Sequence, residues 1–189
     1  EQFEADLAEK EWIFVFSDDT GTIQGFSTLM RLNIHVDGQP VVAVYSGDTI
    51  IHPDFWHEME LPKLWGKHVF ALAAEVHAQT PDAKVYWFLI SSGYKTYRFL
   101  PVFFQTFYPS YRQPTPPHIQ RTIHALARHK FGDQYDPDTG VIRFAASSPL
   151  REGVAQVYER RLTNRDIAFF VEKNPGHAEG EQLAGLVES

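Results

Sequence analysis

The stretch from residue 40 to residue 79 constrains the fold of this chain more than any other part of the sequence. It opens with an apolar, β-branched run, Val41 to Ile51, that is broken only by Ser46-Gly47-Asp48-Thr49, and such a run is typical of a buried strand. Apolar residues then recur at steps of three and four, the spacing of one helix face: Leu61, Leu64, Trp65, His68, Val69, Leu72, Ala73 and Val76. We predict a strand, a loop over 52–61 that faces free helix N–H groups, and a helix over 62–79.

The segments on either side of this stretch predict four strands in one sheet. A continuous apolar run at 12–16 and an alternating pattern over 24–36 indicate two strands that precede it, and Asp37-Gly38 is a hairpin signal. An apolar run at 84–91 indicates a central strand after the helix. The order strand, strand, strand, helix, strand therefore indicates an antiparallel meander that leads into a β–α–β unit.

The C-terminal half carries mostly helix signals. The aromatic segment 94–111 contains Pro101, which must kink a helix or begin one. Further expected elements are a helix at about 116–130 capped by Thr115, a short strand at 141–145, a helix at 151–162, a helix that Asn164 caps, and a strand at 182–187.

The run Ile51-His52-Pro53-Asp54-Phe55, with the long helix and the strand at 84–91 followed by Gly93, resembles the GNAT superfamily of acyl-CoA-dependent N-acyltransferases. The resemblance covers roughly residues 11–108. It implies a single α/β domain with a mixed, largely antiparallel sheet around the β–α–β unit, in which a mostly helical part over 109–189 follows the family-like core. Because the chain begins at Glu1 and not at Met, we expect the family's first strand and first helix to lie upstream.

This resemblance implies that an amine directly attacks an acyl thioester, with no acyl-enzyme intermediate. The donor would be acyl-CoA or an acyl-phosphopantetheine on an acyl carrier protein, and the acceptor an amine on a small molecule or peptide. In the family, the strand before the helix separates from its neighbour and binds the donor's pantetheine arm through backbone groups. A backbone N–H near the strand end, here at Ile50 or Ile51, would polarise the acyl carbonyl.

The loop before the helix departs from the family. It reads Trp56-His57-Glu58-Met59-Glu60-Leu61 where the family has a glycine-rich pyrophosphate loop. Carboxylates close to a helix start repel a diphosphate. The residues that would offset them are Lys63, Lys67, His57 and His68, and we assign the first three to donor binding. We therefore expect CoA to bind more weakly than a carrier-bound or lipophilic thioester.

Five side chains are candidates for the chemistry itself. Asp48, His52 and Tyr45 lie on or beside the central strand, where one of them could accept the amine proton. Tyr94 and Tyr97 lie where the family often carries a tyrosine near the leaving thiolate, and we assign Tyr94 to catalysis and Tyr97 to donor binding. Each has a purely structural alternative: a turn or bulge for Asp48, a surface position for His52, and packing for the tyrosines.

The aromatic segment 94–111 suggests where an acyl chain would lie. Its aromatic residues fall on most faces of a helix, and one apolar stripe would be enough to fill a core. We predict a hydrophobic channel between this segment and the strand at 40–51, able to take more than an acetyl group. Dense packing under the C-terminal helices is the alternative.

The composition and net charge of the chain exclude or disfavour several kinds of site and partner. The chain has 189 residues, no cysteine and a net charge of −7, which excludes disulfides and a cysteine nucleophile and disfavours nucleic acid as a partner. No apolar run reaches the length of a membrane span, nothing resembles a signal peptide, and we expect a cytoplasmic protein. The arginines of the C-terminal half either bind an anionic carrier or form a solvated face: Arg143, Arg151, Arg160, Arg161 and Arg165.

Two other functions remain open. The first is a non-catalytic binding or scaffold protein that kept the fold and lost the phosphate loop. The second is a metal-dependent enzyme that uses His52 and His57. Because the spacing of these residues matches no metal motif, we expect no metal.

Overall fold

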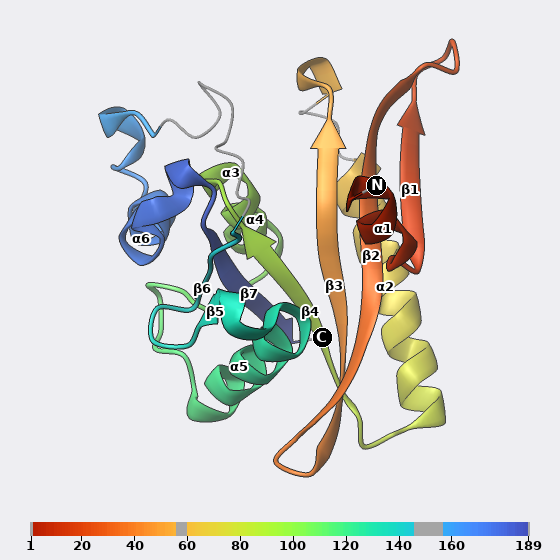
Figure 1. Ribbon diagram of the computed structural model, residues 1–189, viewed down its shortest axis with the longest axis vertical. Coiled ribbons are helices and arrows are strands. Elements are labelled where there is room, and N and C mark those ends of the chain that lie inside the picture. The colour runs from red at the N-terminus through yellow and green to blue at the C-terminus, as the bar shows by residue number, and fades with distance from the viewer. Residues whose placement is uncertain (1, 56–59, 146–156, 189) are drawn as a thin grey trace. The chain divides into compact units, whose positions relative to one another are not determined.

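The computed structural model describes residues 2–55, 60–145 and 157–188. Its strands are β1 (Trp12–Ser17), β2 (Ile23–Val36), β3 (Gln39–Ile51), β4 (Lys84–Ser91), β5 (Tyr135–Asp136), β6 (Val141–Ile142) and β7 (Gln182–Glu188). Its α-helices are α1 (Gln2–Ala8), α2 (Glu60–Gln79), α3 (Tyr94–Tyr97), α4 (Phe99–Phe103), α5 (Pro117–Phe131) and α6 (Arg165–Lys173). Within the described ranges the seven strands form one sheet in the order β1-β2-β3-β4-β7-β6-β5 (Figure 1).

The chain forms two compact units, and the boundary between them falls inside β4, between Trp87 and Phe88. The predicted α/β class and the four predicted strands of one sheet are confirmed. In the part of the chain that the structure describes, no helix is both long enough and apolar enough to cross a bilayer.

The first unit is a meander of β1, β2 and β3 with α2 packed on one face. β1 pairs antiparallel with β2, and β2 with β3. The predicted hairpin is confirmed: Asp37 (φ 53°) and Gly38 (φ 78°) connect β2 to β3, and positive φ at both positions is typical of a two-residue turn that matches the twist of the strands.

Helix α2 buries one stripe of side chains, as its spacing predicted. The buried residues are Leu61, Trp65, Val69, Leu72, Ala73 and Val76. Leu64 and His68, which the spacing assigns to the same face, are half-buried at its margin. The edge of the His68 ring contacts Trp12 and Phe14 of β1, with ring centroids 4.5 and 5.5 Å apart.

The second unit combines the end of β4 with helices α3 to α6 and the short strands β5 to β7. The aromatic segment does not form one kinked helix: α3 and α4 are separate short helices, and Pro101 lies inside α4. Pro116, and not Thr115, is the N-cap residue of α5. The predicted strand at 141–145 is limited to Val141–Ile142.

Two other C-terminal predictions are confirmed. The Asn164 side chain accepts hydrogen bonds from the N–H groups of Asp166 (3.0 Å) and Ile167 (3.2 Å), which caps α6, and β7 is the predicted last strand. The predicted helix at 151–162 lies in part outside the described residues; its described end holds a 3-10 turn at Glu159–Arg161.

Replacing Leu72 with alanine tests the packing of α2. Leu72 is buried on the helix face that covers the sheet, so Leu72→Ala should lower the free energy of unfolding by about 2–5 kcal/mol. Phe70 on the same helix is 63% exposed, and Phe70→Ala should change it by no more than about 0.5 kcal/mol. Urea unfolding of the two variants measures both values, and equal losses would contradict this packing.

The environment of His68 predicts how stability depends on pH. Burial lowers the pKa of His68 below its usual 6.5, and its buried Nε2 atom makes no hydrogen bond to any residue that the structure describes. The unfolded chain therefore binds a proton more readily, so stability present above about pH 6.5 is lost as the pH falls toward the lower pKa of the folded state. Unfolding midpoints from pH 7.5 to pH 5 should fall less in His68→Phe than in the wild type.

The same series of unfolding measurements across pH includes a control variant. His77 lies on α2 and is exposed, so His77→Gln should follow the wild-type pH profile. Burial also lowers the pKa of His124, and some acid sensitivity should therefore persist in His68→Phe. A profile identical to that of the wild type would show that His68 does not contribute.

Candidate functional site

The candidate site is centred on a β-bulge in β3. Ser27 pairs with Thr49 and Leu29 pairs with Ser46, so the register between β2 and β3 shifts by one residue. Gly47 and Asp48 together lie opposite the single residue Thr28. Bulges bend a strand and re-aim its side chains, and they are frequent beside active sites.

On the face covered by α2, two indole N–H groups hold the strands on both sides of the bulge. Trp65 of α2 donates to the Ser27 hydroxyl (3.0 Å), which also shares a hydrogen bond with the Thr49 hydroxyl (2.9 Å). Trp87 of β4 donates to the Ser46 hydroxyl (2.5 Å). The two indole rings meet edge to face, with centroids 5.7 Å apart. Because a buried indole N–H needs a partner, this network fixes the second turn of α2 over the bulge.

On the opposite face, the bulge allows a close approach that only glycine permits. Thr28 is fully buried, and its hydroxyl makes no hydrogen bond to any described residue. A Cβ atom at Gly47 would lie 2.7 Å from this hydroxyl and 3.2 Å from Cε of Lys10. The first distance is shorter than real Cβ contacts, so a side chain at this position would require the Thr28 side chain or the strand to move.

A buried lysine accompanies the bulge. The Lys10 side chain is only 2% exposed, and its Nζ atom lies 3.7 Å from Oδ2 of Asp48, whose side chain is 49% exposed. An ammonium group that loses most of its water needs a nearby anion. The bulge therefore presents a carboxylate that is open to solvent on one side and faces a buried cation on the other.

The two isoleucines at the end of β3 differ in where their N–H groups point. The His52 N–H donates to the Gln24 carbonyl (2.7 Å). Hydrogen-bonded pairs alternate along an antiparallel ladder, so Ile50 directs its N–H at β2 and Ile51 directs its N–H to the other edge of β3. That other edge is the side on which β4 lies in the sheet, so the assignment of Ile50 or Ile51 to the acyl carbonyl stays a prediction.

The charged residues after β3 are exposed and partly paired with each other. His52 precedes a 3-10 turn at Pro53–Phe55, and its Nδ1 atom lies 3.7 Å from Oδ2 of Asp54. Lys63 pairs with Glu60 at 2.8 Å, which neutralises one acid at the start of α2, and Lys67 is exposed. The predicted donor-binding residue His57 lies outside the described residues.

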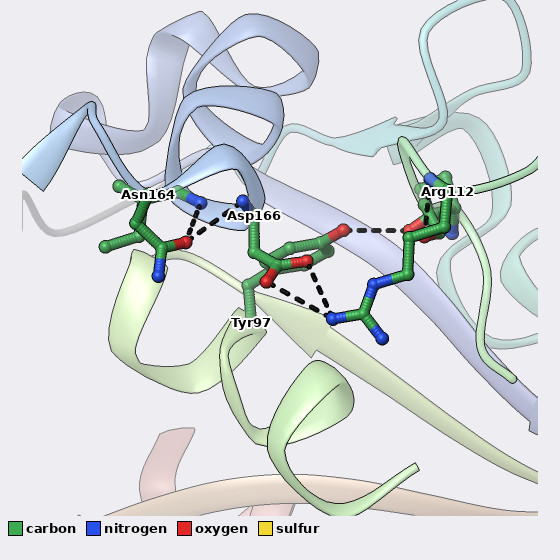
Figure 2. A network of polar contacts seen from close by, with 7 residues as sticks. Tyr97, Arg112, Asn164 and Asp166 are labelled. Atoms are coloured by element: carbon green, nitrogen blue, oxygen red, sulfur yellow. Dashed lines mark hydrogen bonds and ion pairs between the residues drawn. The ribbon is translucent and has the colours of Figure 1, made fainter. Parts of the chain in front are cut away.

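The two candidate tyrosines are buried in the second unit. Tyr97 is 1% exposed, and its hydroxyl donates to the Pro109 carbonyl (2.9 Å; Figure 2). Burial, and then the charge of Asp166, raise the pKa of Tyr97 well above its usual 10.0, so this hydroxyl stays protonated. Tyr94 is also buried, and the Arg161 guanidinium lies 5.6 Å from its ring centroid.

These positions favour the packing interpretation for the aromatic segment. Its buried members are Tyr94, Tyr97, Leu100, Phe107 and Tyr108, and its exposed members include Val102 and Phe103. The hydrophobic channel against the strand at 40–51 stays a prediction.

Sequence reasoning missed the residues that support the bulge. The small polar run at 46–49 was the only signal, and it indicated a turn or bulge as the structural alternative for Asp48. Nothing in the sequence placed Lys10 or Thr28 beside that run, because both come from segments far away along the chain.

Neither a protein-family model nor a curated protein sequence matches this chain. Within the described ranges, no three histidine, aspartate or glutamate side chains are grouped as a metal site would require. The case for a function therefore depends on the geometry of the bulge and on the sequence resemblance.

A double-mutant cycle tests the close approach at the bulge. Gly47→Ala should lower the free energy of unfolding by about 1–3 kcal/mol, because the new methyl group collides with the Thr28 hydroxyl. The same substitution should be less destabilising in a Thr28→Ala background, where the colliding atom is absent. Chemical denaturation of the four proteins gives the coupling energy. Gly66→Ala is the control, since a Cβ there meets no atom within 4 Å; a coupling energy of zero would contradict the contact.

Proposed function

We propose that the bulged end of β3 is an acyl-transfer site, at which an amine attacks an acyl thioester. The observation that carries this proposal is the bulge itself, where Gly47 leaves room for the Thr28 and Lys10 side chains and Asp48 is held beside a buried lysine. It lies on the strand that leads to α2, which is the position that the resemblance to the GNAT superfamily assigns to the donor.

The donor would bind at the end of β3, because the body of this strand is paired with β2 on one side and with β4 on the other. Pantetheine carries amide groups that can exchange hydrogen bonds with a strand backbone. Following the resemblance, we assign a backbone N–H at Ile51 to the acyl carbonyl. A backbone N–H is already oriented when negative charge develops on that oxygen, so it stabilises the transition state without reorganisation.

Asp48 is the group we assign as general base. The amine nitrogen forms a bond to the thioester carbon, the carbon–sulfur bond breaks, and the amine proton passes to the Asp48 carboxylate while the thiolate leaves. Positioned bases of this kind contribute about 10²–10⁴-fold to rate. Lys10 would hold the carboxylate in place, and His52, exposed at the end of the strand, is the alternative base.

The charge around the start of α2 favours a donor without a diphosphate. Glu60 is paired with Lys63, and Asp54 is exposed beside His52. Neither arrangement provides the unpaired cations and close glycine N–H groups that bind a diphosphate. A carrier-bound or lipophilic thioester is therefore the donor we expect, with acyl-CoA as the weaker one.

Thiol release and amide formation test the proposal directly. The protein would be incubated with acetyl to palmitoyl thioesters of CoA and of an acyl carrier protein, together with small-molecule and peptide amines. We expect an amide product, and Asp48→Asn should lower kcat by about 10²-fold or more. Asp82→Asn makes the same change at an exposed turn after α2 and should leave kcat unchanged.

The result also separates this proposal from the binding-only alternative. Retention of a thioester on the purified protein without any amide product would favour a non-catalytic binding protein. Wild-type kcat in Asp48→Asn and a large loss in His52→Gln would move the base to His52. Neither binding nor product with any donor would overturn the proposal.

A further inference from the structure

Three arginines around the start of α6 lie over aromatic rings and form what we call the arginine face: Arg160, Arg161 and Arg165. The guanidinium carbon of Arg165 lies 4.5 Å from the ring centroid of Tyr111. Arg161 lies over Tyr94 and Arg160 over Tyr158, each at 5.6 Å. A ring below a guanidinium holds its plane by cation–π attraction and leaves its N–H donors available at the edge.

These arginines have no carboxylate within salt-bridge distance among the described residues, although two carboxylates are close by in the sequence. Glu159 is exposed in the same 3-10 turn as Arg160 and Arg161, and Asp166 pairs with Arg112, at 3.4 Å (Figure 2). All three arginines are exposed, and they form a local cationic surface on a chain whose net charge is −7. An acidic chain that keeps three ring-stacked guanidinium groups within six residues of sequence, unpaired with any described carboxylate, has a surface suited to an anionic partner.

The surroundings of the arginine face indicate a protein partner more than a small anion. Tyr158 is 51% exposed and Leu162 is 40% exposed, so apolar area accompanies the charges. Exposed Tyr and Arg together are typical of residues that dominate binding at protein interfaces. The start of α6 is closed to a phosphate, because the Asn164 side chain already accepts from two of its N–H groups and Asp166 adds a negative charge there.

Other anionic partners fit less well. Recruitment to acidic lipid typically uses clusters of about 4–8 basic residues, and this face has three on a chain of net charge −7. The same net charge opposes binding along a nucleic acid, which needs many phosphate contacts.

We propose that the arginine face is a docking surface for an acidic protein segment. The stacked guanidinium groups form paired hydrogen bonds with the carboxylates of this segment, and Tyr158 and Leu162 cover its apolar side. This inference does not depend on the proposed acyl transfer.

The test uses the full chain and a designed helical peptide. Fluorescence anisotropy would measure binding of a labelled helix with glutamates at i, i+3, i+4 and i+7 and one exposed leucine, against the same helix with glutamines. We expect saturable binding of the glutamate helix that weakens as salt rises, and no binding of the glutamine helix. Equal binding of both peptides, or binding of neither, would overturn the proposal.

Matched charge reversals locate the surface. Arg161→Glu and Arg165→Glu should each weaken binding about tenfold, since attraction is replaced by repulsion. Arg128→Glu on α5 makes the same change of net charge at an exposed site and should have little effect. Equal weakening by all three variants would show that only net charge matters, and would overturn the assignment to this face.

Conservative variants separate oriented guanidinium groups from positive charge alone. Replacing Arg160, Arg161 and Arg165 together by lysine keeps the charge but loses the paired hydrogen bonds, so binding should weaken about threefold or more. Wild-type affinity in that variant would overturn the role of stacking. The protein could instead bind vesicles of anionic phospholipid, or duplex DNA, more strongly than it binds the peptide. That result would show that the partner is a lipid surface or a nucleic acid and not a protein. Circular dichroism of each variant checks that the fold is kept.

Discussion

The close approach of Gly47 to Thr28 is the contact on which the geometry of the candidate site depends. It exists because two residues of β3 lie opposite one residue of β2, and because no Cβ atom separates the strands at that point. The indole hydrogen bonds of Trp65 and Trp87 hold the strands on the other face. The same few contacts therefore position the end of β3, the Asp48 carboxylate and the second turn of α2.

The contacts at the bulge are energetically unfavourable in part. A buried hydroxyl without a hydrogen bond costs about 1–3 kcal/mol, and Thr28 is such a group among the described residues. The Lys10 side chain is buried beside it, with the Asp48 carboxylate 3.7 Å from its ammonium group. Proteins tend to break local rules where function requires a particular geometry. The unsatisfied hydroxyl at this bulge is the physical reason for proposing chemistry there.

The sequence predicted those features that depend on local periodicity. The strands of the first unit, the long helix and the Asn164 cap follow from spacing and from capping chemistry within a few residues. Prediction from the sequence failed where residues far apart along the chain determine the local structure. Lys10 lies beside the bulge only after β1, β2 and β3 have paired, and the hydroxyl of Tyr97 is directed by the Pro109 carbonyl. A motif resemblance assigned roles to both tyrosines, but only their three-dimensional surroundings revealed that they are enclosed.

The position of β7 in the sheet has a consequence for how the second unit is made. β7 is the last strand along the chain, yet it lies between β4 and β6, and Tyr108 pairs with Leu186 through two main-chain hydrogen bonds. During synthesis, β4 and the β5–β6 hairpin leave the ribosome before the strand that joins them. Until β7 emerges, each therefore has an unpaired edge, and such edges invite pairing with other chains. Folding of the second unit therefore cannot finish until β7 has been synthesised. Before that point the nascent chain is most prone to pair with other chains through its open strand edges.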